Sequence, residues 1–161
     1  MEFKVGDVVF LKNNPERLMT VSYVFGEVKT ARGLFHKLCL KLLRKFCGIV
    51  DGDVHCNWFD GLECEGNFFT AKELIKKDSD TTRPILEEED AVFLKSNPER
   101  LLSVSLVLGK TMIYEFQLKR MVKTLSNFGF VDGDVQCMWL AGKEFQEVFF
   151  RAEMLVKTHI E

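Results

Sequence analysis

The feature that most constrains the fold of this chain is an internal repeat. The segment 14–18, NPERL, recurs at 97–101 with an offset of 83 residues, and the segment 50–58 is matched by 131–139 with an offset of 81. Self-similarity at a nearly fixed period is the signature of repeated structural units. The sequence therefore predicts two copies of one small domain in tandem.

A polar segment separates the two copies. Residues 78–86 are rich in charged and hydroxyl side chains, contain Pro84, and lead into the acidic run 87–90, a composition typical of a linker. We predict a first domain over residues 1–77, a linker over 78–86 and a second domain over 87–161. With 161 residues and 47% apolar content, the chain has enough material for one compact unit or for two small domains that help each other fold.

Within each copy, strand-like patterns dominate. Val54, Cys56 and Trp58 alternate with more polar residues, as Val135, Cys137 and Trp139 do in the second copy, which places each trio on one inward face of a strand. A glycine at 61 or 142 follows where a hairpin turn is needed. Each copy is expected to form a small, curled sheet with one helix attached.

Both copies carry an insertion with a helical period. Phe35, Leu38, Leu42 and Phe46 recur at spacings of three and four, which predicts an amphipathic helix at about 33–46. The counterpart is predicted at about 115–128. The apolar side of the first helix is wider than one small sheet needs, so we expect the helices to pack together across a pseudo-twofold axis. The same surfaces could instead pair between chains, by dimerisation or by exchange of an element.

Several elements of the first copy follow a known pattern, namely Lys4 to Val9, Pro15, Met19 to Val21, Val54 to Phe59, and Phe69 with Leu74. In this order they resemble the YodC-like family of small uncharacterised bacterial proteins. The second copy departs from the family pattern at 88–91 and 140–141, and the insertions have no counterpart in the short family members. The resemblance implies a small β-barrel of the Src-homology type, and it implies no activity.

The predicted fold class is therefore α+β. It consists of two tandem Src-homology-type, barrel-like domains, each with an inserted amphipathic helix.

No set of residues predicts catalysis. Asp51 and Asp53, repeated as Asp132 and Asp134, could share a hard cation, but Asp-Gly is also the expected pair for a tight turn entering a strand, and we favour the turn. Cys56 and Cys137 are expected to be core thiols, since the neighbouring His55 belongs to the opposite face of its strand. We predict a protein that is not an enzyme and has no metal and no cofactor.

The composition of the chain bears on disulfides, metal binding and cellular location. Five cysteines without a Cys-x-x-Cys pair favour neither disulfides nor a closed zinc site. His36 and His159 have no equivalents in the other copy, which argues against a metal site. No segment has the apolar length of a membrane span, and the N-terminal sequence has no signal-peptide pattern, so the expected location is the cytoplasm.

The repeated segment Pro15-Glu16-Arg17, which recurs at 98–100, has two interpretations. Proline at the start of a turn fixes φ, so the segment could be retained for its shape. Alternatively, it could present Arg17 and Arg100 to a partner. We favour the shape.

The remaining candidate for binding is basic charge. The chain has a formal charge of −2, yet residues 28–47 contain six basic side chains and no acidic one. Such a helix could contact phosphates, an anionic membrane surface or an acidic protein, or it could be merely solvated. The candidate partner-binding residues are Arg32, Lys37, Lys41, Arg44, Lys45, Lys119, Arg120 and Lys123.

The preferred hypothesis is a non-catalytic interaction module that docks a protein partner or another copy of itself. The alternative is nucleic-acid binding through the basic helices, with Trp58, Phe59 or Trp139 as stacking platforms. The inward placement of both tryptophans weakens that alternative.

Overall fold

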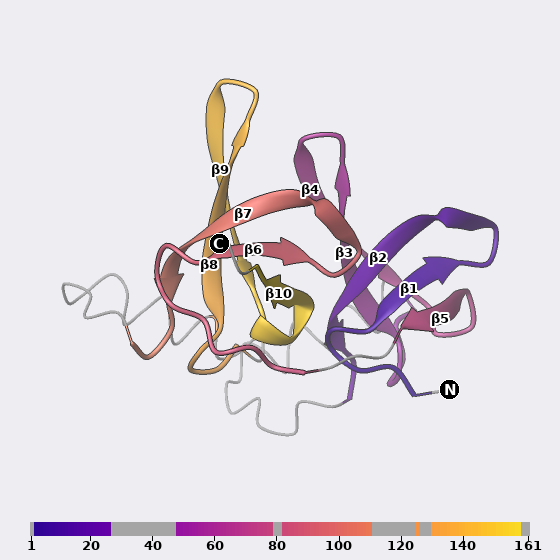
Figure 1. The fold of residues 1–161 in the computed structure, drawn as a ribbon. Helices are drawn as coiled ribbons and strands as arrows, with labels where there is room; N and C mark the ends of the chain where they lie inside the picture. The colour runs from indigo at the N-terminus through magenta and orange to yellow at the C-terminus, as the bar shows by residue number, and fades with distance from the viewer. Residues whose placement is uncertain (1, 27–47, 79–81, 111–124, 126–129, 159–161) are drawn as a thin grey trace.

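Two antiparallel five-stranded sheets make up the part of the chain that the computed structural model describes, which is residues 2–26, 48–78, 82–110, 125 and 130–158 (Figure 1). Sheet 1 has the order β4-β3-β2-β1-β5 and comprises β1 (Val8–Leu11), β2 (Asn14–Val24), β3 (Val54–Asp60), β4 (Glu63–Phe69) and β5 (Leu74–Asp78). Sheet 2 has the order β10-β6-β7-β8-β9 and comprises β6 (Ala91–Leu94), β7 (Asn97–Val107), β8 (Val135–Ala141), β9 (Glu144–Phe150) and β10 (Leu155–Lys157). The corresponding strands of the two halves thus occur in the same spatial order.

The predicted α+β class with barrel-like domains is wrong. The described residues are almost entirely strand and loop, with a 3-10 turn, η1 (Ala152–Met154), before β10. Each sheet is open, because its outermost strands pair with one neighbour each and not with each other. The edge strands β5 and β10 have five and three residues. The predicted helices at 33–46 and 115–128 lie outside the described residues, apart from Leu125.

The predicted alternation along the central strands is confirmed. In β3 the side chains of Val54, Cys56 and Trp58 are buried and those between them are only partly buried. The same pattern occurs in β8. Alternation of this kind puts one face of each sheet on a hydrophobic core, and each half accordingly has its own core cluster.

The repeated Pro-Glu-Arg segment forms a bulge in a strand. In the β1–β2 pair the register moves from Phe10 opposite Leu18 to Leu11 opposite Asn14, so residues 15–17 have no partner on β1. The β6–β7 pair has the same shift, which leaves residues 98–100 unpaired. The expected turn therefore lies at residues 12 and 13, and the proline begins a bulge rather than the turn itself.

The N-terminal segment packs against the second half of the chain. Val5 belongs to the core cluster of the second half. Next to it, Gly6 has φ +90, and a Cβ at that position would lie 2.3 Å from the carbonyl oxygen of Glu153. Only a residue without a side chain allows this close approach.

We expect Gly6→Ala to lower the free energy of unfolding by about 2–4 kcal/mol, because overpacking adds to the strain of a left-handed backbone. Gly52→Ala is the matched control, because Gly52 has a φ of +94 and a Cβ added there would meet nothing within 4 Å. The control should lower the free energy of unfolding by only about 1–2 kcal/mol. Equal losses for the two variants in urea denaturation would contradict the close packing of the halves at Gly6.

Candidate protein-interaction surface

The outer face of sheet 1 packs on the second half of the chain. Phe59 in β3 stands directly opposite Cys64 in β4, and both are partly buried against the core cluster of the second half. Leu18 in β2 shares this outer face, because its neighbours Met19 and Val21 are in the core. We call Leu18, Phe59 and Cys64 the first row.

The tip of the β3–β4 hairpin makes specific contacts with the second half. The Phe59 and Trp139 rings meet edge to face, with centroids 5.2 Å apart. The indole Nε1–H of Trp139 donates a hydrogen bond of 2.9 Å to the carbonyl of Leu62. The guanidinium of Arg100 lies 5.1 Å from the centre of the Phe59 ring and donates to the carbonyl of Gly61 at 2.7 Å. Packing, cation–π attraction and two hydrogen bonds thus act at one point.

A buried polar pair lies beside this contact. The hydroxyl oxygens of Thr20 and Ser96 are 2.8 Å apart, and the backbone N–H of Ser96 donates to the Thr20 hydroxyl at 3.0 Å. Both residues are buried, and the mutual bonds offset the cost of removing them from water. We call Ser96, Arg100 and Trp139 the second receiving end, because together they accept the outer face of sheet 1.

The corresponding residues of the first half are left without such a contact. These are Asn13, Arg17 and Trp58, which we call the first receiving end. The Nε1–H of Trp58 is buried and has no hydrogen-bond partner among the described residues. Arg17 lies 5.7 Å from the centre of the Trp58 ring and forms an exposed ion pair of 3.5 Å with Asp60. The packing of the halves is therefore one-way, and the predicted pseudo-twofold arrangement is wrong.

The second half also has an exposed equivalent of the first row. Leu101, Leu140 and Phe145 correspond in sequence to Leu18, Phe59 and Cys64, and we call them the second row. Their exposed fractions are 56%, 54% and 70%. Leu140 stands directly opposite Phe145 in the β8–β9 hairpin, which projects from the body of the protein at the top of the view (Figure 1).

The two bulges meet at the seam between the halves. A groove of about 590 Å³ is lined by Asn14, Glu16, Arg17 and Leu18 on one side and by residues 96–99 on the other, with Phe59 between them. Arg17 and Arg100 both lie over aromatic rings, one in its own half and one in the other half. The bulge thus has a defined shape, and that shape sets each arginine over an aromatic side chain.

The predicted basic binding residues are not placed by the structure. Arg32, Lys37, Lys41, Arg44, Lys45, Lys119, Arg120 and Lys123 all lie outside the described residues. The same is true of His36 and His159.

The second aspartate of each Asp-Gly-Asp segment clamps a turn. Asp134 is fully buried, and its carboxylate accepts hydrogen bonds from the backbone N–H groups of Val131 and Ala152. Asp53 binds the equivalent N–H groups of Val50 and Ala71. Asp51 is exposed on the preceding turn. Within the described ranges no group of three or more metal-ligating side chains occurs.

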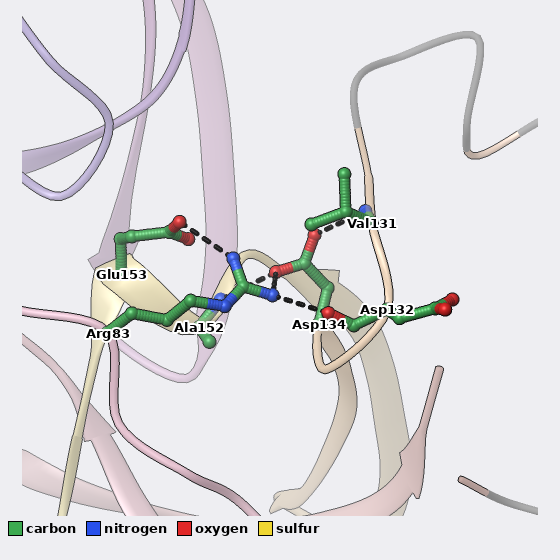
Figure 2. Close-up of polar contacts among 6 residues, drawn as sticks. All are labelled: Arg83, Val131, Asp132, Asp134, Ala152 and Glu153. Carbon is green, nitrogen blue, oxygen red and sulfur yellow. Dashed lines mark hydrogen bonds and ion pairs between the residues drawn. The ribbon is translucent and has the colours of Figure 1, made fainter. Parts of the chain in front are cut away.

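An arginine from the linker completes the clamp in the second half. Figure 2 shows Arg83 between Glu153, at 2.7 Å, and Asp134, at 3.0 Å, with a further bond to the carbonyl of Asp132. Burial raises the pKa of Asp134, and the two backbone hydrogen bonds and the charge of Arg83 only partly offset this effect. Arg83 therefore stabilises the ionised form of Asp134.

The cysteines near the aspartate clamps are not set up as nucleophiles. Cys56 and Cys137 are fully buried. Burial raises the pKa of both thiols, and it raises the pKa of Cys137 to about 12, so neither thiol ionises at neutral pH. His55 lies on the opposite face of β3, where its ring contacts Phe68 and its Nδ1 lies 2.7 Å from the Ser22 hydroxyl.

Comparisons with known proteins add no relationship. No family model matches the chain, and no curated protein or solved structure matches it either. The resemblance to the YodC-like family remains a prediction from the sequence. Among the described residues, no helix has the length and apolar character needed to cross a membrane.

Sequence reasoning missed the two rows, although a signal for them is present. In β3 and β8 the residue after the inward tryptophan is Phe59 or Leu140, so an apolar side chain occupies an outward position in both halves. A solvated outer face would favour polar residues there.

Replacing Arg83 with methionine should lower the free energy of unfolding by about 1–3 kcal/mol, because it leaves the buried Asp134 carboxylate without its cation. The loss should shrink as the pH falls through the raised pKa of Asp134, since a neutral acid needs no counter-charge. Arg83→Lys should give an intermediate loss. A loss that is independent of pH in urea titrations would contradict this role.

The two tryptophans offer a matched pair. Trp139→Phe removes an indole N–H that is hydrogen-bonded, whereas Trp58→Phe removes one that has no partner. At low protein concentration, we expect Trp139→Phe to lower the free energy of unfolding by about 1 kcal/mol more than Trp58→Phe does. If Trp58→Phe were the more destabilising change, the assignment of the unpaired indole would be wrong.

Proposed function

We propose that this protein is a non-catalytic interaction module that docks another protein, or a second copy of itself, through the second row. The observation that carries the proposal is the exposure of Leu101, Leu140 and Phe145 on three neighbouring strands. Exposed apolar residues are common when scattered singly. Gathered on one face, they mark a binding site.

The first half supplies an independent argument. Its equivalent row, Leu18, Phe59 and Cys64, lies at the seam with the second half, and Phe59 and Cys64 are covered by that half's core. A row of this kind therefore fits against a protein surface. Side chains at the same positions in the second half are all apolar: Leu101 matches Leu18, Leu140 matches Phe59, and Phe145 stands where the first half has Cys64.

The chemistry of the described residues supports the proposal that the module is non-catalytic. The buried aspartates are engaged by backbone N–H groups, and the buried thiols are neutral at physiological pH. The nucleic-acid alternative gains no support, because the basic side chains on which it rests lie outside the described residues.

The test is a double substitution, Leu140→Glu with Phe145→Glu. Both side chains are exposed, so the free energy of unfolding should change by only about 0.5 kcal/mol. We expect the wild-type protein to gain mass in light scattering as its concentration rises, or to retain a protein partner, and we expect the variant to lose that association.

The matched control is Val50→Glu with Ile85→Glu, which introduces the same charges at two apolar side chains exposed elsewhere, at 60% and 79%. The control should associate like the wild type. A wild-type protein that remains monomeric at high concentration and retains no protein through the second row would refute the proposed function.

A further inference from the structure

We infer that the partner for the second row is another copy of this chain, which binds through its first receiving end in a head-to-tail arrangement. This inference rests on the proposed function and adds the identity and orientation of the partner. Its basis is that a complete example of the contact exists inside one molecule, while both of its components are present a second time and unused.

The one-way packing of the halves determines the arrangement. The first row binds the second receiving end, and these are two different patches. An interface between different patches leaves one of each free, and it can be repeated by the next molecule. In this chain the free patches are the second row and the first receiving end.

The unpaired indole of Trp58 indicates where the contact forms. Trp139 donates its Nε1–H to the carbonyl of Leu62 at the tip of the β3–β4 hairpin. The residue equivalent to Leu62 in the β8–β9 hairpin is Lys143. The N–H of Trp58 is inaccessible in a single molecule, so docking has to displace the Arg17 side chain that lies over the Trp58 ring. The carbonyl of Lys143 from a second copy would then satisfy this N–H, and Leu140 would pack on Trp58 as Phe59 packs on Trp139.

Arg17 can change partners at little cost. Arg100 donates to the docked carbonyl of Gly61, and the equivalent acceptor in a second copy is Gly142. Arg17 now pairs with Asp60 at 3.5 Å, and the two side chains are 45% and 65% exposed. Exposed pairs of this kind contribute little to stability, so docking can replace the pair with a hydrogen bond to Gly142.

The polar pair of the seam also has free equivalents. Thr20 and Ser96 correspond to Ser103 and Asn13. Both of these residues are exposed, and both side chains can donate and accept hydrogen bonds. The apolar, aromatic and polar parts of the seam therefore all have an unoccupied counterpart between copies.

The decisive experiment mixes two defective variants. The row variant carries Leu140→Glu and Phe145→Glu, and the receiver variant carries Arg17→Glu. Each variant alone should associate more weakly than the wild type by roughly a factor of ten or more. In an equimolar mixture, the row variant supplies an intact first receiving end and the receiver variant an intact second row, so a one-to-one complex should form.

Trp58→Phe serves as a second receiver variant, and Asp60→Asn as a matched control that leaves Arg17 in place. The control should associate at least as well as the wild type. Circular dichroism and thermal melting establish that every variant is folded.

The outcomes separate the two proposals. If both receiver variants associate as the wild type does while the row variant does not, the second row binds something other than the first receiving end, and the head-to-tail inference fails alone. If the wild type does not self-associate at any concentration, the inference fails, and the proposed function then depends on a different protein partner. Recovery of association only in the mixture supports the inference.

Discussion

The seating of Phe59 between Trp139 and Arg100 is the contact on which the arrangement of the two halves depends. It covers an outward-facing apolar side chain, satisfies a buried indole N–H and engages a guanidinium that projects from a strand bulge. The polar pair of Thr20 and Ser96 fixes the same seam a short distance away. Two small open sheets, each with a core cluster of its own, are held against each other in this way.

Much of the local structure could be predicted from the sequence. The alternation around Cys56 and Cys137 places the buried faces of β3 and β8 correctly, and Gly52 and Gly133 have the positive φ that the Asp-Gly turns need. These features depend on side chains within a few residues of one another. The Pro-Glu-Arg bulge was harder to predict, because a strand that resumes at Asn14 with three unpaired residues resembles a turn in sequence.

The relation between the halves could not be predicted in the same way. Repeated sequences suggest symmetry, and pseudo-twofold packing was the natural expectation. The actual packing is set by differences between equivalent residues, such as Asp60 in one half and Ala141 in the other, and by the close approach of Gly6 to Glu153. Such differences matter only once the halves are in contact, so a pattern read along one copy does not reveal them.

The central claim is that the second row and the first receiving end form a contact between molecules like the one within each molecule. Amide hydrogen exchange of the wild-type protein at low and at high concentration tests this most directly. We predict slower exchange at high concentration at the tip of the β8–β9 hairpin and around Arg17, with little change at the internal seam. Exchange that is independent of concentration in both regions would contradict the account.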